Sequence, residues 1–311
     1  MPLYWKRKAL AAKSESPYGT DSTPTAASNA ILARNVKLSP LEQNVEDKNR
    51  DIHYIGAQGK IIAGNFVKID FEVELAGSGA AGSAAPYGAL LKACGMSETL
   101  NAGTSAVYAP VQPGSETSCS IYFWMGGRRH RITGSLGNAE FQLVKGRVPL
   151  IKFSFMGLYN IPTDVALPTP TLTGFQAPLA VNNTNTTPVT LHSFSGVFSE
   201  VSMATGNELN YRNLIASEAI RFTDRKSTGK VKLEDSLVAT FDPWTKIKAA
   251  TLGTLSVAHG TAAGNIVTLA GSNVQLLAPS MDQDQNIAML GMDLEFVPSS
   301  SGSDEWSITL T

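Results

Sequence analysis

Residues 68–75, KIDFEVEL, alternate strictly between apolar and charged side chains. The odd-numbered residues from Ile69 to Leu75 are apolar, and the even-numbered residues from Lys68 to Glu74 carry charge. A period of two is typical of a β-strand that buries one face and leaves the other in water. Because such a strand must pair through its backbone and be covered on its apolar face, this segment constrains the chain to a fold built on β-sheets.

Other segments of the first half also predict strands. Residues 120–125 and 128–133 flank Gly126-Gly127, two residues that accept the positive φ angles of a tight turn, and they therefore predict a β-hairpin. Strands are predicted again at residues 139–144 and 150–158. The first half is therefore mainly β.

One short helix is predicted in each half, and the two helices share a pattern. Residues 87–94 lie between Pro86 and Gly95, which are a start and a stop signal. Leu90 and Ala93 follow Pro86-Tyr87 at the offsets at which Ile247 and Ala250 follow Pro243-Trp244. Strand-like segments precede and follow both helices, at residues 36–38, 68–75 and 139–158 in the first half and at residues 196–203, 230–233 and 274–296 in the second.

This shared order predicts an internal duplication, with chance agreement between two β-domains as the alternative. The second half offers no evident counterpart for the hairpin at residues 121–133. We expect an extended arm at residues 1–30, a first β-domain at 31–160, a linker rich in Pro, Thr and Asn at 161–190, and a second β-domain at 191–311. The sequons beginning at Asn182 and Asn185 are interpreted as polar turns.

Composition argues against several classes of function. With 25 basic and 26 acidic residues the net charge is -1, so the chain as a whole offers no positive field to grip nucleic acid. Charged residues make up 16%, below the roughly 25% of an average soluble domain, which predicts that other subunits cover much of the surface. No stretch approaches the roughly 20 apolar residues of a membrane span, and no signal peptide is recognised, so we expect no membrane partner and assembly in the cytoplasm.

Catalytic, cofactor and metal sites are not predicted. The four histidines are scattered singly, and Cys94 and Cys119 have no metal-ligand spacing and are expected to be buried. The Gly-rich residues 77–82 lack the Lys-Ser/Thr ending of a phosphate loop and are interpreted as a flexible connection. Residues 128–131, RRHR, lie near Trp124 and could hold a nucleic acid, but we expect them on an outer wall or an interface between subunits.

Open sheet edges favour self-assembly. Two small β-domains leave unpaired backbone groups at their edges, and pairing between copies would close a ring. The segments 42–66 and 206–222 are longer than ordinary connections and mix apolar with charged residues, so we expect them to contact other subunits.

Several runs resemble the tail tube proteins of long-tailed bacteriophages (siphophages), and together they cover nearly the whole chain. They are Tyr18-Gly19-Thr20-Asp21-Ser22-Thr23-Pro24, Asn29-Ala30-Ile31-Leu32-Ala33-Arg34-Asn35-Val36, Phe71-Glu72-Val73-Glu74-Leu75-Ala76-Gly77-Ser78-Gly79, Tyr87-Gly88-Ala89-Leu90-Leu91-Lys92-Ala93-Cys94-Gly95, Tyr211-Arg212-Asn213-Leu214-Ile215 and His259-Gly260-Thr261-Ala262-Ala263-Gly264-Asn265. No single run is a diagnostic chemical signature.

The resemblance implies two tandem tube-type β-sandwich or barrel domains, each with one short α-helix, in a subunit of the virion tail. It implies stacked rings around a channel, with self, tape-measure, tail-terminator and tail-tip proteins as partners and double-stranded DNA as passing cargo. With the duplication, the ring is expected to be a trimer with pseudo-sixfold symmetry; a hexamer is the alternative. Contacts between subunits or rings are expected at Tyr4, Trp5, Tyr18, Val45, Asp51, Tyr54, Ile55, Ile61, Ile62, Phe66, Tyr211, Arg212, Leu214 and Ile215.

Three other functions stay open at the level of sequence. A tail-tip or baseplate module for host attachment would also use β-domains joined by a Pro/Thr linker. A glycan-cleaving enzyme on a β-scaffold would need one defined acidic residue, which the sequence does not single out. The tube of a contractile injection system is closely related to the tail tube and is poorly separated from it by sequence.

Overall fold

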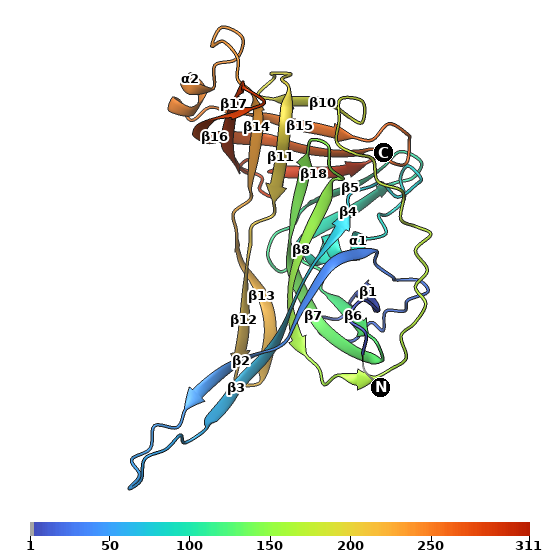
Figure 1. Cartoon of the computed structure of the whole chain (residues 1–311), viewed down its shortest axis with the longest axis vertical. Helices are drawn as coiled ribbons and strands as arrows, with labels where there is room; N and C mark the ends of the chain where they lie inside the picture. Colours follow the sequence, from blue (N-terminus) through green and yellow to red (C-terminus); the bar gives the residue numbers. More distant parts are fainter. Residues whose placement is uncertain (1–2) are drawn as a thin grey trace.

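A computed structural model describes residues 3–311, and this part of the chain is mainly β, as the sequence predicts (Figure 1). Eighteen strands and two short helices follow in the order β1 (Lys8–Ser14), β2 (Ala33–Asp47), β3 (Lys60–Glu74), α1 (Gly88–Ala93), β4 (Met96–Asn101), β5 (Ser105–Pro110), β6 (Cys119–Met125), β7 (Arg128–Val144), β8 (Leu150–Tyr159), β9 (Thr163–Asp164), β10 (Thr186–Leu191), β11 (Phe198–Ala204), β12 (Asn207–Leu214), β13 (Ser217–Arg225), β14 (Thr228–Glu234), α2 (Pro243–Lys248), β15 (Leu252–His259), β16 (Val267–Asp284), β17 (Ile287–Phe296) and β18 (Trp306–Leu310).

Both halves of the chain follow one plan of strand pairing. In the first half the pairs run β1-β6-β7-β8-β3-β2, and in the second they run β10-β15-β16-β17-β14-β11. In both, a short strand beyond this path, β9 or β18, pairs with the start of the long strand, β7 or β16. The helix follows β3 in one half and β14 in the other. This shared plan supports an internal duplication.

The plan corrects one expectation from the sequence. The predicted hairpin at the Gly126-Gly127 turn is present as β6–β7, but it does have a counterpart, the β15–β16 pair. Residues 260–266 connect β15 to β16. This connection is longer than the Gly126-Gly127 turn and has no Gly-Gly pair, so the sequence does not reveal that β15–β16 corresponds to β6–β7. The element without a counterpart is the β4–β5 hairpin, which pairs with the C-terminal strand β18.

The alternation of β3 places its apolar face in the core. Ile69, Phe71 and Val73 are at most 2% exposed, and Phe71 packs against Phe153 and Phe155 of β8 with ring centroids 5.6 and 5.8 Å away. Each such side chain contributes on the order of 1.5–3 kcal/mol by leaving water. One connected apolar core extends from these residues into the second half. The β-sheet fold therefore rests on the pattern seen at residues 68–75.

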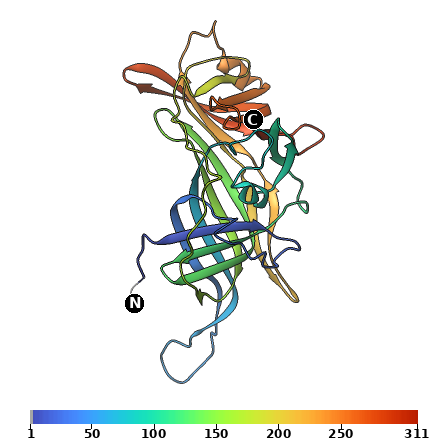
Figure 2. The same ribbon diagram turned by 90° about the vertical axis from the view of Figure 1, so that its right-hand side faces the viewer.

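Two strand pairs join the halves. Residues 140–144 of β7 pair antiparallel with residues 200–204 of β11, and β5 pairs with β18. The expected linker runs along the first half (Figures 1 and 2), where the Val165 amide donates to the Gly127 carbonyl over 3.0 Å and the Thr171 amide to the Ala26 carbonyl over 2.9 Å. Short strands, β9 and the start of β10, lie within the range 161–190.

Part of the expected N-terminal arm belongs to the sheet of its own chain. Residues 8–14 form β1, which pairs with β6, and Leu10, Ala11 and Ala12 are at most 3% exposed. The Glu15 carboxylate then accepts hydrogen bonds from the hydroxyl groups of Ser118 and Ser120, both over 2.7 Å. The run KALAAKS contains mostly small residues, so its period of two is weak in the sequence.

The long segments 42–66 and 206–222 are mostly regular β-hairpins and are not irregular loops. β2 continues to Asp47 and β3 begins at Lys60, so only residues 48–59 lie outside the two strands. The second segment forms the β12–β13 hairpin, with Leu214 opposite Ser217. Both hairpins are exposed on much of their surface and interrupted by bulges, which removes the alternation that would predict strands.

Candidate assembly interface

Two long hairpins occupy equivalent places in the two halves. The β2–β3 hairpin extends from the first half, and the β12–β13 hairpin continues from β11 and β14 in the second half. Their tips point toward the same end of the molecule, and the β2–β3 hairpin projects beyond the body of the protein (Figure 1). The equivalent hairpin packs against the body of the protein in the second half and projects into solvent in the first half. This difference indicates that the projecting hairpin presents a surface for another protein.

The β12–β13 hairpin is packed on the first half. Ile220 is fully buried and Ala219 is 5% exposed. The Tyr18 hydroxyl accepts a hydrogen bond from the Ile220 amide over 2.7 Å and lies 3.1 Å from the Gly134 carbonyl. At the root of the hairpin, the Asn207 amide group donates to the Cys94 carbonyl over 2.8 Å and to the Gly137 carbonyl over 3.0 Å.

The β2–β3 hairpin instead presents apolar side chains to solvent. Val45, Ile61 and Ile62 on its strands are 46–52% exposed. At its tip, Tyr54 is 63% exposed and Ile55 is fully exposed. Clustered exposure of large apolar side chains on a projecting element is typical of a protein–protein contact surface.

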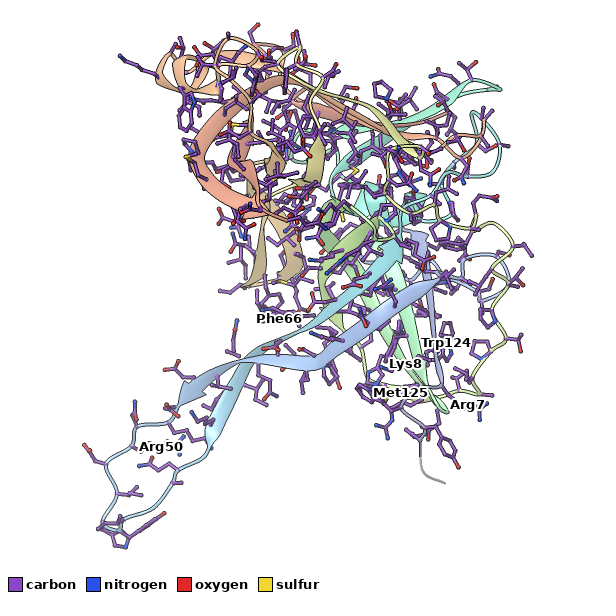
Figure 3. All side chains as sticks on the ribbon, turned by 45° about the horizontal axis from the view of Figure 1, so that its top comes forward. Arg7, Lys8, Arg50, Phe66, Trp124 and Met125 are labelled. Carbon is purple, nitrogen blue, oxygen red and sulfur yellow. The ribbon has the colours of Figure 1, made fainter. Side chains whose placement is uncertain are left out.

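The two hairpins touch each other near their roots. The rings of Phe66 and Tyr211 lie with centroids 5.0 Å apart, and Figure 3 shows Phe66 where the projecting hairpin leaves the body. The Tyr211 hydroxyl donates to Glu218 over 2.6 Å and accepts from the Asn65 amide over 3.1 Å. At Gly64 an added Cβ would lie 2.8 Å from the Tyr211 hydroxyl, so this approach requires glycine. Desolvation and then Glu218 raise the pKa of Tyr211 to about 12.

The structure places the predicted contact residues in three regions. Asp51, Tyr54, Ile55, Val45, Ile61 and Ile62 lie along the projecting hairpin; Arg212, Leu214 and Ile215 lie toward the tip of the β12–β13 hairpin. Tyr4 and Trp5 are exposed near the N-terminus, where Trp5 packs under the Lys8 ammonium group at 3.7 Å from the ring centroid. Phe66, Tyr211 and Tyr18 make contacts within their own chain. Their contacts with other subunits stay predictions.

Two sheet edges that sequence reasoning missed complete the candidate interface. Among residues 3–311, no strand pairs with the outer edge of β2, and none pairs with the outer edge of β16 beyond Gln275. Met281 near the end of β16 and Ile287 at the start of β17 are 70% and 52% exposed. The sequence matches residues 139–158 with residues 274–296, but which strand edges stay unpaired depends on the order of the strands in the sheet.

The arginine-rich strand does not form an exposed stacking platform. Trp124 is 4% exposed and packs with Tyr122 against the small residues Ala9 and Ala11 of β1, and Val165 and Leu167 pack against the same cluster. The Arg129 guanidinium group lies 4.7 Å from the centre of the Tyr122 ring, and Arg131 pairs with Asp21 over 3.2 Å. A base cannot stack on the buried indole without displacing this cover. The expected place of this strand on an outer wall or an interface stays a prediction.

The Gly-rich residues 77–82 dock on the second half. The Gly77 amide donates to Asn265 over 2.7 Å, and an added Cβ at Gly77 would lie 2.2 Å from the Gly264 carbonyl oxygen. The backbone groups that a phosphate would need are therefore in contact with protein. The sequon asparagine Asn182 accepts hydrogen bonds from the amides of Thr184 and Asn185, which confirms a polar turn.

The other reactive groups in the described part of the chain do not form a site. Cys94 and Cys119 are buried free thiols, and burial raises the pKa of both. Within residues 3–311, no group of three or more His, Cys, Asp or Glu side chains is placed to hold a metal ion. Neither helix in these residues has the length and apolar character of a membrane-spanning segment.

Comparison with models of known protein families gives a match over most of the chain. The family model described as "Phage tail tube protein" matches residues 5–297, nearly the whole chain. The search of curated proteins found no matching relative.

Proposed function

The chain belongs to the phage tail tube protein family, and from this membership we propose that it polymerises into stacked rings around a channel through which the genome passes. The family is structural and belongs to the virion tail. The observation that carries the proposal is the projecting β2–β3 hairpin, whose exposed apolar side chains need a second molecule to cover them. Assembly in the host cytoplasm and a long, non-contractile (siphophage) tail are part of the proposal.

The face of the large sheet that points away from the core supports the proposal that the sheet lines a channel. Strands β3, β8, β7, β11, β14 and β17 lie side by side in one sheet, with their apolar side chains in the core. Their other face carries charged groups that pair across strands, including Lys152 with Glu140 at 3.9 Å and Lys230 with Asp293 at 3.7 Å. A surface of small and paired charged groups can line a water-filled passage without binding its cargo tightly. Double-stranded DNA and the tape-measure protein are the proposed contents.

The ring is proposed to contain three copies. Each chain carries two domains of the same pairing plan, so three chains supply six domains and a pseudo-sixfold ring. A hexamer of whole chains is the alternative, and it would place twelve such domains in one ring.

Stacking is proposed to use the end of the molecule at which both hairpin tips lie. The N-terminus, with Tyr4 and Trp5 nearby, lies toward the same end (Figure 1). Residues 48–59 extend farthest and would reach the adjacent ring, as proposed for the whole segment 42–66 and for residues 1–30. Tail-terminator and tail-tip proteins would occupy the two ends of the stack.

Electron microscopy of the purified chain tests the proposed function. We expect rings with a central hole and tubes with regular striations, each ring containing three copies by native mass spectrometry. A chain that stays monomeric at every concentration and salt condition would contradict the proposal, whereas a single ring found only at the tail tip of the virion would favour a tail-tip module.

A further inference from the structure

The β7–β11 pair joins the two halves within one chain. The strands that correspond to β7 and β11 in the other halves have no such partner in the part of the chain that the structure describes. Inside the chain, residues 140–144 at the end of β7 pair with the outer edge of β11. By the shared pairing plan, β16 corresponds to β7 and β2 corresponds to β11. Within residues 3–311, the end of β16 and the outer edge of β2 both lack such a neighbour.

We propose that the end of β16 in one copy adds as an antiparallel strand to the outer edge of β2 in the next copy. The occupant of both edges is therefore a second copy of this chain. This inference rests on the proposed ring assembly and specifies which strands join its subunits. Strand addition of this kind satisfies the unpaired backbone groups at both edges.

The pairing registers within the chain fix the register between copies. Ile151 of β8 pairs with Val73, the last residue but one of β3. Leu290 of β17 pairs with Leu233, the last residue but one of β14, so Leu290 corresponds to Ile151. Phe141 lies opposite Ile151 and Met281 lies opposite Leu290, so Met281 corresponds to Phe141. In the same way Leu38, opposite Ile69 of β3, corresponds to Met203, opposite Gly229 of β14.

Because Met203 pairs with Phe141 within the chain, Leu38 is assigned to Met281 of the next copy. In an antiparallel pair, one residue back along β2 faces one residue forward along β16, so Lys37 lies opposite Asp282. Continuing in the same direction places Arg34 beside Asp284.

The charges of the two edges match. The β2 edge carries Arg34 and Lys37, and the end of β16 carries Asp282 and Asp284. In the single chain Lys232 pairs with Asp282 and Lys145 with Asp284. The incoming basic side chains would join these pairs, so no charge is left buried alone at the junction. Opposite charges across an antiparallel pair stabilise it and disfavour other registers.

Side chains are buried at the β7–β11 pair within the chain, and their counterparts at the free end of β16 are exposed, as the proposal requires. Phe141 and Leu143 of β7 are at most 2% exposed because β11 and its surroundings cover them, whereas the corresponding Met281 is 70% exposed. Beside β11, a cavity of about 360 Å³ is lined by Leu143 of β7 and by Lys145 just after it. Beside β2, an open cleft of about 920 Å³ is lined by residues of β2, β3 and β8 and by the segment before β1, and no strand of the described residues pairs with β2 on that side. Within it the Lys8 ammonium group donates to the Val36 carbonyl over 3.4 Å, a contact that an incoming strand would replace.

The test is a designed disulfide between copies. In Leu38→Cys/Met281→Cys the two Cα atoms would lie about 4.5–5.5 Å apart, within the range that a disulfide accepts. The native Cys94 and Cys119 are at most 1% exposed and do not compete. We expect mild oxidation of the assembled protein to convert the monomer band into a covalent ladder that ends at a closed trimer. The matched control Leu38→Cys/Asp282→Cys places the thiols on opposite faces of the sheet and should give no ladder.

A charge exchange gives an independent readout. Lys37→Glu alone and Asp282→Lys alone should abolish assembly, and the double variant should restore it, with unchanged thermal unfolding of all three monomers as the check on folding. Wild-type rings whose paired cysteines do not cross-link would overturn the proposed junction and leave the ring function intact. Failure of the wild type to form rings would instead count against the proposed function itself.

Discussion

The β2–β3 and β12–β13 hairpins hold equivalent places in a duplicated chain, yet one projects and the other is docked. The docked hairpin buries Ile220 completely and is fixed by Tyr18, while the projecting hairpin leaves Val45, Ile61 and Ile62 about half exposed. A hairpin of this kind therefore needs a neighbouring domain to cover its apolar side chains. For the second half that neighbour is the first half of the same chain, and for the first half we propose that it is another molecule.

Removal of the projecting hairpin should have the largest effect. Replacing residues 43–65 by a two-residue Asn-Gly turn would connect Glu42 to Phe66, which already face each other. We expect a folded monomer that forms no tubes, since the removed residues contribute little to the core. Size-exclusion chromatography and electron microscopy measure this, and normal tubes from the shortened chain would contradict the assignment of the hairpin to assembly.

Equivalent apolar truncations in the two hairpins should differ strongly in stability. Ile220→Ala should lower the free energy of unfolding by about 2–5 kcal/mol, because it opens a cavity beneath a buried residue. Ile61→Ala, at a side chain that is 49% exposed, should stay within about 0.5 kcal/mol in the monomer and should impair polymerisation instead. Urea unfolding compares the two variants. Equal losses of monomer stability would mean that both hairpins are docked.

The hydrogen bond between Tyr18 and the β12–β13 hairpin predicts a loss of stability at high pH. Burial raises the pKa of Tyr18 to about 12, above the ordinary value of 10.0. The folded state then keeps the phenol proton when the unfolded chain has lost it, so stability should fall as the pH rises from about 10 to about 12.

Tyr18→Phe removes the acceptor of the Ile220 amide and should cost about 1–3 kcal/mol at neutral pH. It should also make the alkaline decline shallower, although Tyr122 and Tyr211, whose pKa values are also raised to about 12, keep part of it. Tyr54→Phe at the exposed tip should change neither property. An alkaline decline that is unaltered in Tyr18→Phe would remove Tyr18 as its cause.

Acid should produce a smaller effect, larger in the second half because two of the three histidines concerned lie there. Burial lowers the pKa of His192 and His259, and of His130 in β7, below the ordinary 6.5. As the pH falls through 6.5 the unfolded chain takes up protons that these folded imidazoles resist, so the stability they contribute above that pH is progressively lost. Amide hydrogen exchange should show β10, β15 and β16 opening more readily at pH 5 than at pH 7. A uniform change over both halves would rule out His192 and His259 as the main source.

How much of the fold the sequence predicts depends on how each strand is buried. The half-buried β3, the Gly-Gly turn of β6–β7 and both helices carry local signals that identify them. β1 is not predicted because most of its residues are small, and the outer parts of β2 and β3 are not predicted because neither face is buried within the chain. Strands whose partner lies in another molecule need not show alternation toward their own core.

The candidate interface shows the same limit. Exposed residues such as Ile55 and Ile61 could be predicted, since apolar residues in a long connection stand out in the sequence. The edges of β2 and β16 could not, because an unpaired edge is a property of sheet order and not of residue type. The sequence predicts Tyr18 as a contact with another subunit, whereas its hydrogen bond to the Ile220 amide of its own chain, 202 positions away, is visible only in the fold.

Amide hydrogen exchange of the monomer and of the assembled tube is the most direct test that the free elements of the first half are completed by a neighbouring copy. The β12–β13 hairpin should be protected in both states, while β2 and the β2–β3 hairpin should exchange rapidly in the monomer and become protected in the tube. Equal protection of β2 in the two states would show that its edge finds no new partner, and would contradict the account.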